Sequence, residues 1–462
     1  MIRVFQKSDA YKFIAQLTGT GAPENTSPST MGDGRVEIGE VSAPDKINGN
    51  CNQKTDETET DTQRSIESAV RDIIATVRRD GDAGVQHIAR QLGDAAPFRL
   101  SADAIEKALC ETDSATKNIL QIAAGRIRNF GKAIVDSVTP VTLDCGEFQT
   151  GIDYRPVRRV ACYVPAGRYP LPSTALMTAV TARVAGVDEV VIVSPQLKTE
   201  IVAAGTMAGV TEFYQIGGAQ AVAAMTFGTE TIDAVDMIVG PGNAYVTEAK
   251  RQLQGTVGID MLAGPSEICV IADDTANPEW LSLDLLSQAE HDPDARAYLL
   301  TDSLAIANEV AELVERDVKK LKLPSFLKDS LGASAVIVLN DINDCIDAAN
   351  KIAPEHLLLA VDNPELLKSK LTSYGALFMG HGCTVAFGDY MAGPNHTLPT
   401  NRSAKFQGCL SPLTFLRPQS WIKVATTARN LANETADFAN IEGLTAHAAA
   451  ASARTKQTSP SN

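Results

Sequence analysis

Residues 159–195 read RVACYVPAGRYPLPSTALMTAVTARVAGVDEVVIVSP and contain the pattern that decides the fold class. Two short runs rich in β-branched residues, 159–164 and 190–195, flank a helical stretch at residues 173–185. Strands that alternate with single helices require crossover connections, so they lie parallel in one sheet. We interpret this stretch as a β-α-β unit of a doubly wound α/β sheet.

The same alternation continues along the chain in two series. The first series runs to residue 240 through TEFYQI and VDMIVG, and the second includes ICVIAD, AYLLTD, AVIVLN, HLLLAV and ALFMG. We therefore predict an α/β protein with two doubly wound Rossmann-like units, each with a parallel sheet. We assign residues 141–261 to one α/β domain, and residues 262–400 with a helical lead-in at 65–140 to the other.

The two ends of the chain differ from this pattern. Residues 19–63 are rich in Gly, Ser, Thr, Asn, Asp and Pro, so we expect the N-terminal segment 1–64 to carry a flexible insertion. Apolar residues then recur at helical spacing up to Asp80-Gly81, which predicts a helix that ends there. Residues 401–462 are expected to form a mostly helical C-terminal segment.

Composition excludes several classes of partner. The 462-residue chain has 41 Lys and Arg against 56 Asp and Glu, and its net charge of -15 argues against nucleic acid or anionic membranes as partners. No apolar run approaches the ~20 residues that a membrane span requires. The eight cysteines are scattered and no secretory signal is evident, so we expect a cytoplasmic protein with a small-molecule substrate.

Two loops suit an anion such as a pyrophosphate. QIGGAQ (215–220) and VGPGNAYVTEAK (239–250) each follow an expected strand and open an expected helix. In doubly wound sheets ligands collect beyond the carboxyl ends of the strands, where small residues and a helix N-terminus can face a phosphate. Neither loop has the G-x-G-x-x-G spacing, so tight packing turns are the alternative interpretation.

A helix expected at residues 278–291 ends in SQAEH, directly before Asp292-Pro293. The spacing of three residues places Gln288 and His291 on one face of its last turn. A histidine at a helix C-terminus can simply complement the helix dipole, and this interpretation stays open here.

Further candidate residues lie in polar, loop-like motifs. His356, His396 and His447 occur in APEHLLLA, GDYMAGPNHTLPT and EGLTAH, and Asp389 lies close in sequence to His396. Imidazoles together with a carboxylate suit a borderline metal such as zinc. Glu355 and His356 have the residue types of a general acid and base, although a solvated charge pair at a strand start is the alternative.

The longest motifs of the chain resemble those of the histidinol dehydrogenase family. They are, in chain order, YVPAG, IGGAQAVAAM, VGPGNAYVTEAKR, GIDMLAGPSEICVIAD, SQAEHDPDA, PEHL, GDYMAGPNHTLPT and EGLTAH. The resemblance covers residues 65–450 and is highly specific, because so many long motifs match in order and spacing. It implies an enzyme that uses zinc and NAD and oxidises an amino alcohol through an aldehyde to the acid, with two NAD molecules in succession.

The resemblance also implies roles for individual residues. The implied zinc ligands are Gln288, His291, Asp389 and His447, and the implied acid/base pair is Glu355 and His356. The implied substrate contacts are Ser266, His396 and Glu442, together with His356 and the zinc ligands, and the implied NAD contacts in domain 141–261 are Tyr163, Gln220 and Asn243. A homodimer is implied as well, in which the C-terminal segment crosses to the partner and the active site is shared between subunits.

L-histidinol is the leading substrate, and a small diol such as sulfopropanediol is the runner-up. CTVAFGDY, LPTNRSAKF and Ala166 depart from the biosynthetic pattern, and Arg402 would offer a fixed cation to a sulfonate or carboxylate. A solvent-exposed Arg402 without a contact is the alternative. A non-catalytic metabolite-binding protein on the same fold is a third hypothesis, but it predicts erosion of the site, and every metal and acid/base position is present.

Overall fold

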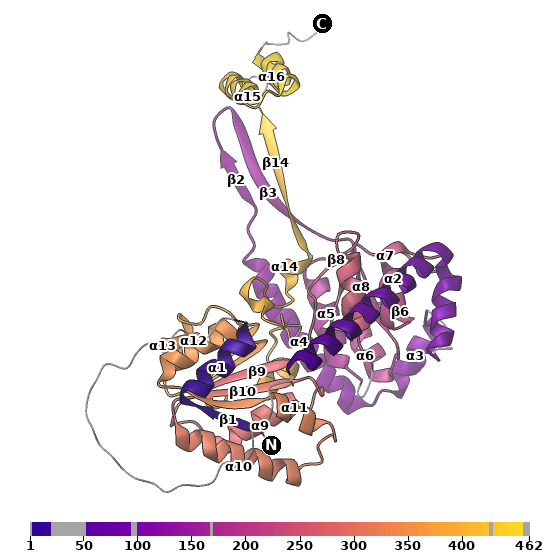
Figure 1. The fold of residues 1–462 in the computed structure, drawn as a ribbon. Helices are drawn as coiled ribbons and strands as arrows, with labels where there is room; N and C mark the ends of the chain where they lie inside the picture. Colours follow the sequence, from indigo (N-terminus) through magenta and orange to yellow (C-terminus); the bar gives the residue numbers. More distant parts are fainter. Residues whose placement is uncertain (1, 20–51, 94–98, 167–169, 425–427, 456–462) are drawn as a thin grey trace, which may run out of the picture.

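The computed structural model describes residues 2–19, 52–93, 99–166, 170–424 and 428–455, and the side chains of 52–62 are not described. Two parallel sheets form the body of the molecule (Figure 1). The six-stranded sheet has the order β1-β11-β10-β9-β12-β13, and the five-stranded sheet has the order β6-β5-β4-β7-β8. The prediction of two doubly wound α/β units is therefore confirmed.

The strands of the six-stranded sheet are β1 (Arg3–Gln6), β9 (Glu267–Ala272), β10 (Arg296–Thr301), β11 (Ala335–Val338), β12 (His356–Ala360) and β13 (Ala376–Met379). Those of the five-stranded sheet are β4 (Arg159–Tyr163), β5 (Glu189–Ser194), β6 (Glu212–Gln215), β7 (Met237–Val239) and β8 (Gly258–Ile259). The central strands β9 and β4 are both fully buried. Continuous apolar runs suit such strands, because helices cover both faces of the sheet.

Helices form the outer layers of both units. The five-stranded sheet is covered by α5 (Pro172–Val184) and α6 (Thr199–Met207) on one face, and by α7 (Gly218–Phe227) and α8 (Ala244–Leu253) on the other. The six-stranded sheet is covered by α9 (Pro278–Ala289), α10 (Leu304–Lys320) and α11 (Leu327–Ala333) on one face, and by α1 (Lys7–Thr18) and α12 (Ile342–Ile352) on the other. The short α13 (Pro364–Lys368) has no buried residue.

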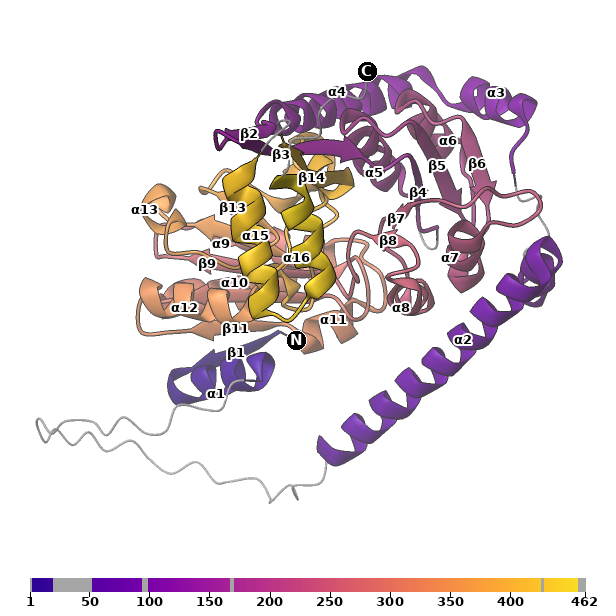
Figure 2. The ribbon, with the colours of Figure 1, turned by 90° about the horizontal axis from the view of Figure 1, so that it is seen from above.

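The helical lead-in belongs to the five-stranded unit, so our grouping of residues 65–140 with 262–400 is wrong. Helix α2 (Asn52–Gln91) packs on α7 and α8, α3 (Ala102–Glu111) packs on α6, and α4 (Ser114–Asp136) packs on α5. Figure 2 shows α2 along the outer side of that unit. An amphipathic pattern reveals which face of a helix is buried but not which surface buries it, so the sequence left this choice open.

The N-terminal segment also differs from expectation. Strand β1 pairs with β11 and α1 packs on α12, so residues 3–18 are part of the six-stranded unit. Residues 20–51 of the expected flexible insertion lie outside the described residues, whereas 52–63 are helical within α2. Gly81 (φ 54°, ψ -133°) interrupts α2 where we predicted a helix end, and the chain resumes a helix beyond it.

An arm projects from the body, and the sequence did not predict its strands. We define the arm as β2 (Val141–Asp144), β3 (Phe148–Pro156), β14 (Leu416–Val424), α15 (Arg429–Ile441) and α16 (Thr445–Ser452). The antiparallel order β14-β3-β2 shows that residues 141–156 leave the domain 141–261. The described part of the C-terminal segment contains the strand β14 in addition to the expected helices. Figure 1 shows α15 and α16 at the tip of the arm, away from both parallel sheets.

The remaining described elements are short. They are α14 (Pro412–Phe415), the π-helical turn η1 (Phe387–Met391), and the 3-10 turns η2 (Ser403–Lys405) and η3 (Ala453–Thr455). Within the described ranges no helix is both long and apolar enough to cross a membrane.

Candidate active site between the two sheets

Glu355 and His356 lie at the amino end of β12, which pairs with β9 and with the edge strand β13 of the six-stranded sheet. Both residues are buried, with 6% and 4% of their surface exposed. The neighbouring strand β9 holds both through Glu267: its N–H donates to Glu355 Oε2 at 2.9 Å, and its carbonyl oxygen lies 3.2 Å from His356 Nδ1. A carbonyl only accepts hydrogen bonds, so this contact places a proton on Nδ1 and makes Nε2 the nitrogen that can gain or lose the second proton.

His356 Nε2 faces the η1 turn, which contains Asp389. It lies 3.5 Å from Asp389 Oδ1 and has no hydrogen-bond partner among the described residues. His396 Nδ1 lies 2.9 Å from the carbonyl oxygen of Asp389. Three predicted site residues from two separate motifs therefore meet at one point.

Burial and charge shift the pKa values of this group in different directions. Burial raises the pKa of Glu355 to about 7, and burial together with the Glu355 charge raises that of Glu267 to about 7. For His356 burial lowers the pKa, but the carboxylates of Glu355 and Asp389 outweigh it and raise the value to about 9. Burial would raise the pKa of Asp389, yet the adjacent imidazole of His356 lowers it. Two carboxyl groups with pKa values near 7 can exchange protons at neutral pH.

Gln288 lies in the last turn of α9 as predicted, but α9 ends at Ala289, so His291 lies beyond the helix and not on its last turn. Gln288 is 2% exposed, and its Nε2 has no hydrogen-bond partner among the described residues. His291 follows the helix and is close enough to Asp389 to lower the pKa of that carboxyl. The body of the chain thus presents three of the four predicted zinc ligands near each other.

Glu442 and His447 do not join this group. Both are exposed on the arm, where α15 and α16 pack on each other through Ala436, Ala439 and Ala448. Over the described part of the chain no group of three or more His, Cys, Asp or Glu residues is arranged to hold a metal ion. The predicted ligand set is therefore incomplete within one chain.

The predicted NAD residues lie at the carboxyl edge of the five-stranded sheet. Tyr163 ends β4, and its hydroxyl accepts a hydrogen bond from the Gly218 N–H at 3.1 Å, at the start of α7. Asn243 caps α8, because its Oδ1 accepts from the N–H groups of Tyr245 and Val246 at 3.1 Å each. Gln220 is 1% exposed, and its Nε2 has no partner among the described residues. This is the edge where a doubly wound sheet presents helix N-termini to a ligand.

The acid/base pair differs from that rule, because it lies at the amino edge of its own sheet. Ser266 directly precedes β9, and its side chain is close enough to the Glu355 carboxyl to lower the pKa of that group. The segment that contains His396 connects the two units: Asn395 Nδ2 donates to the Met177 carbonyl in α5 at 2.8 Å. The predicted NAD residues therefore lie at the carboxyl edge of the five-stranded sheet, and the predicted acid/base pair lies at the amino edge of the six-stranded sheet.

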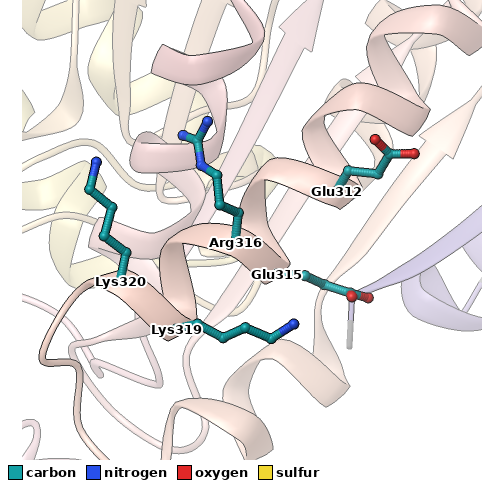
Figure 3. Close-up of a pocket in the computed structure, with 5 residues that line it drawn as sticks. All are labelled: Glu312, Glu315, Arg316, Lys319 and Lys320. Atoms are coloured by element: carbon teal, nitrogen blue, oxygen red, sulfur yellow. The ribbon is translucent and has the colours of Figure 1, made fainter.

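A cavity of about 500 Å³ lies beside the predicted metal ligands. Its walls are mainly apolar and come from α4 and α5, and its ionisable lining residues within the described ranges are Glu290, His291 and Tyr390. A second hollow, of about 540 Å³, lies on the outer surface of α10 (Figure 3) and is lined by Glu312, Glu315, Arg316, Lys319 and Lys320. No predicted site residue lines the second hollow.

Arg402 does not take the role that we expected from its sequence position. Its φ is 64°, and its guanidinium donates to the carbonyl of Thr18 at the end of α1. We had expected Arg402 either to contact an anionic substrate group or to be exposed to solvent without a contact. Instead it binds the C-terminus of α1, a helix of the N-terminal segment.

Sequence reasoning missed Glu267. The signal was present, since a glutamate begins the otherwise apolar strand 267–272 directly after Ser266. A buried charged residue needs a partner or a function. The sequence did not reveal that Glu355 is the neighbour of Glu267, because this contact depends on the pairing of β9 with β12.

Known proteins match this chain over most of its length. The family model for histidinol dehydrogenase matches residues 56–455. A histidinol dehydrogenase 1 of Nostoc sp. is 43% identical over 397 residues, which cover 84% of this chain and 92% of that protein. A histidinol dehydrogenase of Agrobacterium fabrum is 42% identical over 408 residues, with 86% and 94% covered.

A solved structure supports the same assignment. The crystal structure of a histidinol dehydrogenase from Elizabethkingia anophelis has a TM-score of 0.81 and 35% sequence identity, and covers 84% of this chain and 92% of that one. The sequence, the order of the motifs and the fold of this chain all agree with those of histidinol dehydrogenases across both α/β units. The chain therefore belongs to the histidinol dehydrogenase family.

Proposed function

We propose that this chain oxidises L-histidinol through the aldehyde to L-histidine, with two molecules of NAD as hydride acceptors and zinc as the resident metal. The observation that supports this best is the acid/base pair held by one strand residue. Glu267 binds Glu355 through its N–H and His356 through its carbonyl. The site thus holds two buried groups, an imidazole and a carboxyl group, each fixed by its own hydrogen bond. Two such groups can serve as the bases of two successive oxidations.

His356 is the proposed base of the alcohol step. The proton on Nδ1 is directed to the Glu267 carbonyl. Nε2 of the neutral imidazole accepts the proton of the substrate hydroxyl, while the carbon that bears this hydroxyl transfers a hydride to NAD. The products of this step are the aldehyde, NADH and a protonated imidazole. The carbonyl of Glu267 also fixes the ring orientation, so the base needs no rearrangement to act.

Glu355 is the proposed base of the aldehyde step. Its pKa of about 7, raised by burial, lets it accept a proton from the water that adds to the aldehyde. The resulting hydrate then transfers a hydride to the second NAD and becomes the acid. Ser266, which is close enough to Glu355 to lower the pKa of that carboxyl, is the proposed substrate contact beside it.

The chemistry of the donor set fits zinc. Two imidazoles, one carboxylate and one amide form an N/O set with a single negative charge, and the buried Gln288 side chain has an amide nitrogen without a partner in the described structure. Gln288, His291 and Asp389 of one chain would hold the metal together with His447 of the partner subunit. When bound there, zinc would supply a Lewis acid that orients and polarises the substrate.

A homodimer with shared active sites explains why the site is incomplete in one chain. His447 and Glu442 are exposed at the tip of the arm, and neither lies with Asp389. The arm also exposes apolar residues, among them Ile422, Phe438 and Ile441 at 71%, 64% and 81%. Exposed apolar surface of this kind is typical of a protein interface. We propose that the arm binds the body of a second copy and that the enzyme acts in the cytoplasm, which the scattered cysteines support, since those within the described ranges are unpaired.

The test is NADH formation with purified, zinc-loaded protein across a panel of histidinol, histidinal, sulfopropanediol and simple diols. We expect histidinol and histidinal to be the preferred substrates, and two NADH per histidinol. A preference for sulfopropanediol would establish the runner-up, which the motif departure at 383–387 favours. Absence of any turnover, with zinc and NAD bound, would support a non-catalytic binding protein.

A further inference from the structure

A buried ion pair holds the loop that starts the proposed NAD site. Strand β7 ends at Val239, and the next residue, Gly240, turns the chain with a φ of 108°. The N–H of Gly240 donates to Asp260 Oδ2 at 2.7 Å, and its carbonyl accepts from Lys250 Nζ at 3.0 Å. Both polar groups of one loop residue are therefore bound by one pair of side chains.

Lys250 and Asp260 come from different elements and meet in the interior of the five-stranded unit. Lys250 lies in α8 and Asp260 follows β8, and their Nζ and Oδ1 atoms are 2.5 Å apart. The two side chains are 2% and 0% exposed, so neither charge faces solvent. Asp260 Oδ1 also accepts from the Met261 N–H at 2.7 Å, which satisfies the carboxylate further.

Stability alone does not account for this pair. Both ions lose their hydration on burial, and apolar residues of similar volume often stabilise a fold as well or better. A buried pair does, however, impose a defined position on the groups that it bonds. Here those groups are the N–H and the carbonyl of Gly240.

The position of Gly240 matters for both neighbouring NAD residues. A Cβ atom on Gly240 would lie 2.2 Å from the carbonyl oxygen of Tyr163, so only glycine permits this approach. Three residues later Asn243 caps α8. The Tyr163 hydroxyl accepts a hydrogen bond from the N–H of Gly218 at the start of α7. A displacement of Gly240 would therefore shift residues 240–243 relative to Tyr163 and Gly218.

We propose that Lys250 and Asp260 form a clamp on Gly240 that positions residues 240–243 to bind NAD. The proposal rests on the NAD site of the proposed function. Both side chains bond to each other and to Gly240, so they act through the loop as positioning residues. Loss of the clamp weakens NAD binding and leaves the acid/base pair, which lies in the other sheet, in place.

Two variants test the clamp by NAD binding and by kinetics. Lys250→Met removes the ammonium group but keeps an unbranched chain, and we expect the Kd and KM for NAD to rise at least about tenfold, because a charge-assisted hydrogen bond to the loop is lost. At saturating NAD, kcat should stay within about twofold of wild type, since the reacting groups are unchanged. Asp260→Asn keeps an acceptor for the Gly240 N–H and should raise the Kd less.

Arg251→Met is the matched control, because Arg251 is the next residue of α8 and pairs with Glu248 and Glu67 but not with Gly240. The double variant Lys250→Met/Asp260→Leu separates positioning from folding. Two apolar residues should restore the melting temperature, while Gly240 still lacks its partners, so NAD affinity should stay low. Recovery of NAD affinity together with stability would overturn the proposal.

Calorimetric titration with NAD needs no substrate, so it distinguishes the two proposals. Wild type that binds NAD but turns over no panel substrate would reject the proposed function and leave the clamp to be judged by Lys250→Met. If Lys250→Met and Arg251→Met bind NAD as tightly as wild type, the clamp is rejected and the proposed function stands. Should Lys250→Met fail to fold, the double variant and Asp260→Asn give the same comparison.

Discussion

Glu267 and Glu355 lie side by side at the amino ends of two neighbouring parallel strands, and the backbone N–H of Glu267 donates a 2.9 Å hydrogen bond to the Glu355 carboxyl. Their side chains are both buried, so two like charges in this place repel each other strongly. The charge of Glu355 contributes to the raised pKa of Glu267, and because the repulsion is mutual, the two groups titrate as a pair.

Glu267→Gln removes one of these charges while it keeps the backbone contacts. Without the neighbouring negative charge, the pKa of Glu355 should fall below about 7. The acid limb of the pH profile for aldehyde oxidation should therefore move to lower pH, by up to about one unit. The profile is measured with the aldehyde as substrate. A limb that stays in place, or moves to higher pH, would contradict the coupling of the two carboxyls.

Glu355→Gln and His356→Ala should affect the two oxidation steps differently. Glu355→Gln should slow aldehyde oxidation more than alcohol oxidation, because only the second step needs an activated water. His356→Ala should slow the alcohol step at least as much, and losses of about 100-fold or more are expected for a general base. Single-turnover assays with the alcohol and with the aldehyde measure each step. Equal losses in both steps for Glu355→Gln would argue against this division of roles.

Asp389→Asn should remove most of the zinc affinity, because Asp389 is the only anionic residue in the proposed ligand set. The loss should exceed the about 10- to 100-fold that follows removal of a residue that only supports a ligand. Elemental analysis after dialysis against a chelator gives the metal content without reference to activity. Asp294→Asn is the control, since this carboxylate is exposed shortly after His291. Full zinc content in Asp389→Asn would exclude it as a ligand.

Mixing two inactive variants should restore activity if the arm completes the partner's site. Glu355→Gln has a defective body and an intact arm, whereas His447→Ala has an intact body and a defective arm. Random pairing gives about half heterodimers, each with one intact site, hence about a quarter of wild-type activity. Native mass spectrometry verifies that heterodimers form. Heterodimers without activity would mean that each arm serves its own chain.

Asp284→Asn should stabilise the protein above neutral pH. Burial raises the pKa of Asp284 from 3.8 to about 6, and its carboxyl bonds to the Thr384 hydroxyl at 2.7 Å. Between these two values the folded state binds more protons than the unfolded state, so stability falls as the pH rises from about 4 to 6 and then stays constant. The shift corresponds to at most about 3 kcal/mol at pH 8.

Urea unfolding of wild type and Asp284→Asn at several pH values checks this dependence. The difference in the free energy of unfolding should be small near pH 4 and reach its maximum above pH 6. An asparagine can still accept the bond from Thr384, so the contact itself is kept. A variant that is equally destabilised at all pH values would show that the carboxyl is charged and paired in the folded state.

The sequence by itself determined the local structure and the residue types of the site. Apolar runs separated by helical periods were sufficient for two parallel sheets, because most side chains of a strand between helix layers are apolar on both faces. Gln288 could be placed in the last turn of a helix, since the spacing within a helix is fixed by its geometry. Motif order was sufficient for the family, and with it for the residues that carry the proposed chemistry.

The tertiary structure decided which distant segments meet. Only the pairing of β9 with β12 brings Glu267 to Glu355, and only the antiparallel pairing of β14 with β3 forms the arm that carries His447 away from Asp389. The same holds for residues 65–140, whose apolar faces pack on the five-stranded unit. Periodicity in a sequence reports that a face is buried, whereas the partner of that face depends on contacts between residues far apart in the chain, which no local pattern contains.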